Sequence, residues 1–172
     1  ERRDVTAATD SASAVERWLM GYYPTYQASL MPVDSVPWGS LTHLAVGAVL
    51  PTTGSTLDTD MYGHAPLVDE LVPLAIAHRV KPILMVGGAG AHDGFVVAAS
   101  DARRASFVRA LVDYAKGHGF VGLDLDWEPI EAEDQAPFEA LARALRGAWP
   151  EAVLTVPVGA INGNYQVVDP WY

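Results

Sequence analysis

Residues 119–129 read GFVGLDLDWEP and hold three acids at alternate positions, Asp124, Asp126 and Glu128. Alternate residues of a β-strand point to the same face. A strand over 120–128 therefore places the three carboxyl groups on one face and the intervening Leu and Trp side chains on the other. The apolar face can pack under helices, which leaves the acidic face for a different environment. Because Pro129 ends the strand directly after Glu128, we expect Glu128 at the rim of the sheet.

Four further short apolar runs, rich in Val, Leu or aromatic residues and bounded by Gly or Pro, predict more buried strands. They cover residues 18–23, 41–50, 80–88 and 152–160. Because helical patterns separate the runs, the chain is expected to form a parallel sheet with right-handed crossovers, either doubly wound or a (β/α)8 barrel. No G-x-G-x-x-G turn of the nucleotide-binding type follows the first strand. The sequence supplies five strands, whereas a closed barrel needs eight and about 250 residues.

Three stretches have apolar residues at helical spacing. They cover 65–79, 100–119 and 134–150. Pro73 is expected to kink the first helix. Ser100 or Asp101 can cap the second helix, and Gly117 can end it. The third helix has an apolar stripe that we expect to face the sheet, formed by Phe138, Leu141, Leu145 and Trp149.

The composition excludes several kinds of partner. The chain has 172 residues, with 21 acidic and 11 basic side chains and a net charge of −10. Nucleic acid and anionic membranes are therefore poor partners, and no apolar run reaches the roughly 18 residues of a membrane span. Without cysteine, disulfides and thiol chemistry are excluded. Residues 1–17 are interpreted as a flexible polar lead without a signal peptide, such as the start of a processed chain, so secretion is the expected localisation.

The three acids lie about 7 Å apart at successive same-face positions and cannot all ionise cheaply in a partly buried site. At least one should hold a proton near neutral pH, which suits general acid catalysis. A solvated acidic strand end or a site for a hard metal ion would show the same pattern. None of the five histidines has the spacing of metal ligands: His43, His64, His78, His92 and His118. From the residues alone, catalytic, metal-binding and structural interpretations stay open.

The stretch GLDLDWEP resembles the DxxDxDxE signature of glycoside hydrolase family 18, the chitinases and related endo-β-N-acetylglucosaminidases. Three more stretches resemble the family in the matching order. GYYPTY is similar to its G-Y-Y first strand, LTHLAVGAV to its L-T-H-I second strand, and ILMVGGAG to its S-x-G-G third strand. The resemblance extends from residue 18 to about residue 160 and implies an α/β fold of the (β/α)8 TIM-barrel type. We therefore expect 18–172 to be a partial catalytic domain with about the first five βα units.

The resemblance also implies a retaining, substrate-assisted mechanism that needs no cofactor. Glu128 would protonate the glycosidic oxygen and later activate water, while the substrate's own 2-acetamido oxygen attacks and forms an oxazolinium ion. Asp126 would orient the acetamido group, and Asp124 would share a proton with Asp126. The candidates for substrate contact are Tyr22, Gly87, Gly88 and Trp127. For Tyr22, a role in the hydrophobic core is as consistent with the sequence as contact with substrate. Trp127 lies on the apolar face of the strand, which favours packing in the core over contact with substrate.

The sequence departs from the family pattern at three positions. Val121 stands for the first Asp of the signature and Met85 for the Ser of S-x-G-G. With both polar groups replaced, Asp124 is expected to be less well hydrogen-bonded and more readily protonated. Ala89 stands where an aromatic residue often follows the glycine pair, which removes one platform for a sugar ring. Tyr26 and Trp38, in or near the loop after the first strand, are further candidates for sugar stacking.

The expected reaction is hydrolysis of β-1,4 bonds between N-acetylglucosamine units of chitin or chitooligosaccharides. The alternatives are an endo-β-N-acetylglucosaminidase that acts on N-glycans and a chitin-binding lectin without turnover; the intact Glu128 favours an enzyme. The family's sixth and eighth strands carry further site residues, and the sequence stops after its fifth strand. We therefore expect a fragment of a longer product, one of two chains that complete a barrel, or an oligomer that covers its open edges.

Overall fold

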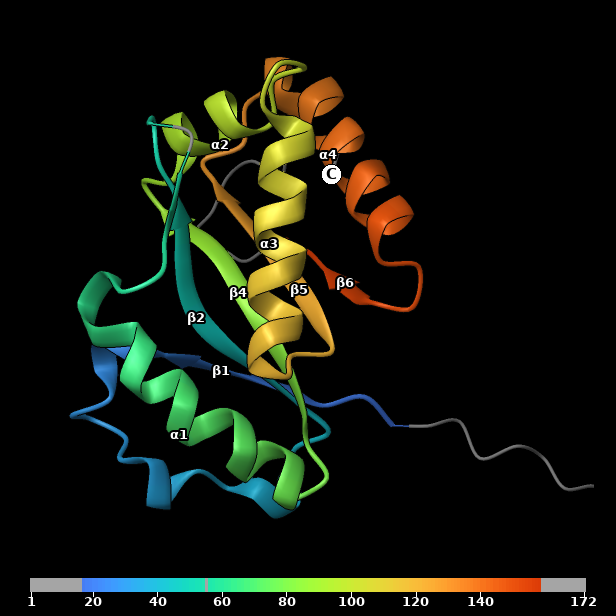
Figure 1. The fold of residues 1–172 in the computed structure, drawn as a ribbon. Helices are drawn as coiled ribbons and strands as arrows, with labels where there is room; N and C mark the ends of the chain where they lie inside the picture. The colour runs from blue at the N-terminus through green and yellow to red at the C-terminus, as the bar shows by residue number, and fades with distance from the viewer. Residues whose placement is uncertain (1–16, 55, 159–172) are drawn as a thin grey trace, which may run out of the picture.

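The fold is a parallel β-sheet with helices packed on one face. The computed structural model describes residues 17–54 and 56–158, and Figure 1 shows its ribbon. Five parallel strands lie in the order β1-β2-β4-β5-β6. Their bounds are Met20–Pro24 (β1), His43–Pro51 (β2), Lys81–Ala89 (β4), Gly122–Glu128 (β5) and Val153–Thr155 (β6). The two-residue strand β3 (Leu57–Asp58) pairs antiparallel with the end of β2. The five predicted strands and their parallel arrangement are confirmed.

Helices connect the successive strands. The α-helices are α1 (His64–Ala77), α2 (His92–Ala98), α3 (Arg104–His118) and α4 (Gln135–Ala148). Short 3₁₀ helices are η1 (Thr25–Gln27), η2 (Val33–Ser35), η3 (Trp38–Ser40), η4 (Met61–Gly63) and η5 (Ala132–Asp134). In Figure 1, α1, α3 and α4 lie over the same face of the sheet. None of the helices in the described ranges is long and apolar enough to cross a membrane.

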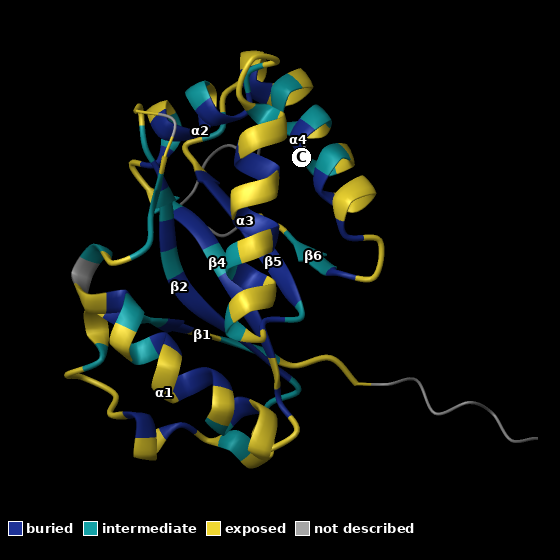
Figure 2. Cartoon of the chain, viewed as in Figure 1, coloured by how far each residue is buried: buried dark blue, intermediate teal, exposed yellow. Residues whose placement is uncertain are grey.

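The hydrophobic core lies between the sheet and these helices. In Figure 2 most of β2, β4 and β5 and the inward sides of the helices are buried, whereas the outward sides of the helices are exposed. Leu123 and Leu125 of β5 are almost completely buried. The ring of Trp127 stacks on that of Phe95 from α2, with 4.8 Å between the ring centroids. Because burying each such side chain stabilises the fold by about 1.5–3 kcal/mol, β5 is firmly held through its apolar face.

Two of the predicted helices agree closely with the structure. The stripe on α4 packs against the core, with Leu141 and Leu145 fully buried and Trp149 and Phe138 beside them. Helix α1 contains Pro73 in its interior, and the expected kink stays a prediction. The predicted lead over 1–17 lies outside the described residues, apart from Arg17, and stays a prediction.

The predicted ends of the helix over 100–119 were wrong. Ser100 does not cap α3, because its hydroxyl donates a hydrogen bond to the carbonyl oxygen of Val97 at 2.7 Å. Asp101 is no cap either, and its carboxylate instead accepts a hydrogen bond from Arg104. The helix runs through Gly117 and ends at Gly119, whose φ of 85° is the left-handed conformation that glycine adopts without strain.

Helix α2 was not predicted from the sequence. Gly94 lies inside it, and a glycine between short polar and apolar segments is typical of a loop. Here the glycine serves close packing against the end of β2, because a Cβ atom at this position would lie 2.0 Å from the carbonyl oxygen of Pro51. A contact between residues so far apart in sequence leaves no local signal.

Candidate active site

A cleft of about 440 Å³ opens at the carboxyl end of the parallel strands. Active sites of (β/α)8 barrels lie at this end of the sheet. The cleft is lined by Pro24, Tyr26, Gly47, Ala48, Leu50, Met61, Met85, Gly87, Gly88, Ala89, Asp126 and Glu128. It therefore combines apolar walls with two carboxyl groups from the end of β5.

The three acids of β5 lie on the face opposite the helices, as the alternation predicted. Their exposure rises along the strand: Asp124 is completely buried, Asp126 is 7% exposed, and Glu128 is exposed. Burial disfavours the charged form of a carboxyl group, most strongly at the inner end of the series. Glu128 is thus the acid most accessible to a molecule in the cleft.

Asp124 interacts with residues from two other strands, β6 and β1. Thr155, its register partner on β6, donates a hydrogen bond from its hydroxyl to Asp124 Oδ1 at 2.5 Å. Tyr22 reaches it from β1, and burial together with the charge of Asp124 raises the pKa of the Tyr22 hydroxyl. Burial raises the pKa of Asp124, while the hydrogen bonds from Thr155 and Tyr22 partly oppose this effect. Asp124 therefore has hydrogen-bond donors in Thr155 and Tyr22. Met85 and Val121, which stand where the family has polar residues, supply none.

Asp126 is the most strongly perturbed acid of the cleft. Burial raises its pKa to about 7, and the charges of Glu128 and Asp124 and a hydrogen bond with Glu128 add to the increase. This hydrogen bond places Glu128 beside Asp126, while a proton shared between Asp124 and Asp126 stays a prediction. Asp126 Oδ1 is buried and has no hydrogen-bond partner among the described residues. The raised pKa lets Asp126 hold a proton near neutral pH, and its Oδ1 is available to a donor on a ligand.

The glycine pair of β4 explains how Asp126 comes to lie in the cleft. Gly87 is the register partner of Asp126 and has a φ of 102°. A Cβ atom on Gly87 would lie 2.2 Å from the carbonyl oxygen of Asp126 and 2.5 Å from the ring of Phe95. Gly87 therefore permits close approach of β4 to β5, while a Cβ atom on Gly88 would lie 3.9 Å from Asp126 Oδ2. Both glycines line the cleft.

The aromatic residues that are candidates for sugar contact lie in different environments. Tyr22 is 45% exposed on the acidic face, and Tyr26 is 61% exposed and lines the cleft. Trp38 lies just before β2, at the opposite end of the sheet, and stacks on His78 with 5.3 Å between the centroids. Trp127 is 3% exposed and packs on the helix side. Only the two tyrosines can therefore meet a molecule on the acidic side of the sheet without rearrangement.

Sequence reasoning missed several residues that shape the cleft. Thr155 lies opposite Asp124 only because of the strand register, which the sequence does not specify. Leu50 and Met61 form apolar walls, and nothing in their local pattern distinguishes them from core residues. Within the ranges 17–54 and 56–158, no group of three or more His, Asp or Glu side chains is placed to hold a metal ion.

Comparisons with known proteins agree with the resemblance carried by the motifs. The sequence model of the glycosyl hydrolases family 18 matches residues 18–168. A chitinase-like effector of Moniliophthora perniciosa is 32% identical over 111 residues, which are 63% of this chain and 25% of the effector. A class V chitinase of Arabidopsis thaliana is 33% identical over 103 residues, which are 53% of this chain and 27% of that protein. The chain thus spans about a quarter of the length of these relatives.

Solved structures match the fold over most of the chain. A chitinase from Rhizomucor miehei superposes with a TM-score of 0.71 at 25% identity, covering 81% of this chain and 46% of that one. A family 18 chitinase from Cycas revoluta, solved in complex with (GlcNAc)3, superposes with a TM-score of 0.70 at 26% identity, covering 80% and 44% of the two chains. The predicted fold, part of a (β/α)8 barrel, is confirmed.

Proposed function

Because the chain belongs to the glycosyl hydrolases family 18, we propose that the protein hydrolyses β-1,4 bonds between N-acetylglucosamine units of chitin or chitooligosaccharides. One observation carries the proposal: an exposed Glu128 and a buried Asp126, whose pKa burial raises to about 7, line a cleft at the carboxyl end of the sheet. We propose that Asp126 and Glu128 share one proton. This pair supplies a proton donor together with a fixed group that can orient a substrate.

The proposed reaction has two steps. The acetamido oxygen of the substrate attacks the anomeric carbon, the glycosidic bond breaks, and Glu128 gives its proton to the leaving oxygen. An oxazolinium ion results, with the enzyme carboxylates close to its positive charge. Glu128 then takes a proton from water, which attacks the anomeric carbon from the side that the leaving group occupied, so configuration is retained.

Asp126 is proposed to orient the acetamido group. Its Oδ1 is buried and unpartnered among the described residues, as suits an acceptor for the acetamido N–H. Its negative charge, once the shared proton has moved to Glu128, would favour the developing oxazolinium ion. Asp124 would keep Asp126 in place from below. The phenol of Tyr22, whose raised pKa keeps it protonated, remains a hydrogen-bond donor on the same face.

The test of this function compares two disaccharide substrates that differ only in the substituent at C2 of each sugar. A fluorogenic N,N′-diacetylchitobioside carries the acetamido nucleophile, whereas a fluorogenic cellobioside has a hydroxyl group in its place. We expect the first to be cleaved and the second to be inert, because no enzyme carboxylate replaces the missing nucleophile. Calorimetric binding of chitooligosaccharides without any turnover would instead indicate a chitin-binding protein.

The activity is expected to fall above about pH 7. Burial raises the pKa of Asp126 to about 7, and above that value the cleft loses the proton that Asp126 is proposed to share with Glu128. For a single proton, kcat/KM should then decrease about tenfold for each pH unit. Initial rates on the fluorogenic diacetylchitobioside across this range measure the decrease, with circular dichroism as the control for folding. A rate that stays constant through pH 8 would contradict the shared proton.

A further inference from the structure

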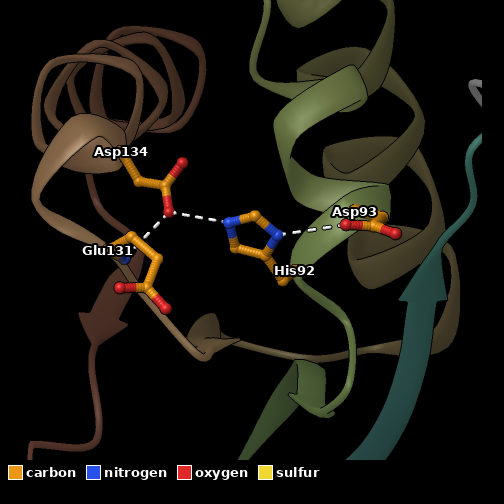
Figure 3. Close-up of polar contacts among 4 residues, drawn as sticks. All are labelled: His92, Asp93, Glu131 and Asp134. Atoms are coloured by element: carbon orange, nitrogen blue, oxygen red, sulfur yellow. Dashed lines mark hydrogen bonds and ion pairs between the residues drawn. The ribbon is translucent and has the colours of Figure 1, made fainter.

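At the carboxyl end of the sheet, the segment that follows β4 contacts the segment that begins at the end of β5 at two points. The first point joins the backbone N–H of Gly90, just after β4, to the carbonyl oxygen of Glu128 at 3.1 Å. The second joins His92 Nε2, at the start of α2, to Asp134 Oδ2 in η5 at 2.9 Å. Figure 3 shows the His92 side chain between the two acidic side chains that it contacts. We call the two contacts together the rim clasp.

Asp134 is a buried carboxylate at the centre of this arrangement, with 4% exposure. It accepts a hydrogen bond from the backbone N–H of Glu131 at 2.9 Å, as half of a capping box. Among the described residues, no Lys or Arg forms an ion pair with Asp134, and the pairing cation is His92. A buried carboxylate that loses its partner strongly disfavours the structure around it. The contact with His92 therefore stabilises the turn from 128 to 134.

Two carboxylates and one aromatic ring surround the imidazole of His92. Asp93 from α2 faces Nδ1 at 3.1 Å, Asp134 from η5 faces Nε2, and the ring of Trp127 from β5 lies edge-on at 6.4 Å. The hydrogen bond with Asp93 is the main cause that raises the pKa of His92, and Asp134 adds to it against the effect of partial burial. Asp93 is almost fully exposed, so its contact with His92 stabilises the local structure less than the contact between His92 and buried Asp134.

We propose that His92 is a positioning residue that, through Asp134 and the rim clasp, holds Glu128 in the orientation required for proton transfer. The inference rests on the proposed function. Glu128 is the last residue of β5, and the segment that follows it leaves the sheet. The clasp fixes this segment at both ends to the residues that follow β4. A displacement of about 1 Å at a reacting group can lower the rate about a hundredfold, so a modest loosening has a measurable effect.

The test measures kcat and KM for His92→Ala, His92→Gln and Asp93→Asn on the fluorogenic diacetylchitobioside. The assay is run about one pH unit below the ordinary histidine pKa of about 6.5, where the imidazole of the wild type is charged. We expect His92→Ala to lower kcat about tenfold with little change in KM. His92→Gln, whose amide can still donate to Asp134, should restore part of kcat, and Asp93→Asn should behave as the wild type. Equal kcat values for His92→Ala and the wild type would overturn the proposal.

Hydrogen exchange at the backbone amides of Gly90 and Glu131 provides a readout that needs no turnover. Faster exchange in His92→Ala than in Asp93→Asn supports the clasp, and equal exchange in the two variants overturns it. If the wild type shows no turnover while the exchange difference is present, the proposed function fails and the clasp stands as an ordering contact. The exchange measurement therefore tests the rim clasp separately from the proposed function.

Discussion

Glu128→Gln is expected to lower kcat on the fluorogenic diacetylchitobioside about a thousandfold, within the range for loss of a general acid. Glutamine has nearly the same shape as glutamate and cannot give up a proton at any working pH. Glu128 is exposed in the cleft, whereas Asp126, the other acid that lines it, is buried, so no other acid of the cleft is equally accessible. Binding of chitooligosaccharides, measured by calorimetry, should persist because the walls of the cleft are unchanged.

The matched control is Glu133→Gln, which neutralises an exposed acid in η5 outside the cleft. Its kcat should equal that of the wild type, since the substitution removes the same charge without touching the proposed site. Turnover by Glu128→Gln within tenfold of the control would remove Glu128 from the role of acid. Loss of binding as well as turnover would indicate that Glu128 acts mainly in binding the substrate.

Gly87→Ala is expected to destabilise the fold by about 3–5 kcal/mol, from the sum of overpacking and backbone strain. The added Cβ would lie 2.2 Å from the Asp126 carbonyl oxygen, which belongs to the neighbouring strand and cannot move away easily. The φ of 102° adds strain that an alanine side chain does not tolerate. Urea unfolding followed by tryptophan fluorescence measures the change.

Gly90→Ala separates the two causes of this loss. Gly90 also has a positive φ, of 83°, and a Cβ atom there would meet nothing within 4 Å. Only the backbone strain remains, so the expected destabilisation is about 1–2 kcal/mol. Equal unfolding free energies for the two variants would mean that β4 and β5 do not approach as closely at Gly87 as the structure indicates.

The features of the fold that follow local rules were predictable from the sequence. Period-two alternation in the stretch 119–129 placed the acids of β5 on one face and its apolar side chains on the other, and the structure has this arrangement. The stripe on α4 follows the helical period, so its burial was equally predictable. In each case the hydrophobic effect acts on one side of a regular element, and the period of that element appears directly in the sequence.

Features that depend on register or on distant contacts were not predictable. Thr155 meets Asp124 through strand pairing, and His92 meets Asp134 across 42 residues of sequence. Gly94 sits in a helix because the backbone of β2 passes close to it, although local propensity favours a loop. Trp38 was placed beside a sugar site by its nearness to the first strand in sequence. It instead lies in η3, before the start of β2, where it stacks on His78.

The acids of β5 are proposed to catalyse substrate-assisted hydrolysis of N-acetylglucosaminides. The ratio of kcat/KM between the fluorogenic diacetylchitobioside and the matched cellobioside tests this proposal most directly, because the two substrates differ in the group that is proposed to attack. We predict a ratio of about a hundred or more, from the loss of a well-oriented internal nucleophile. A ratio near one, with both substrates cleaved, would contradict the account.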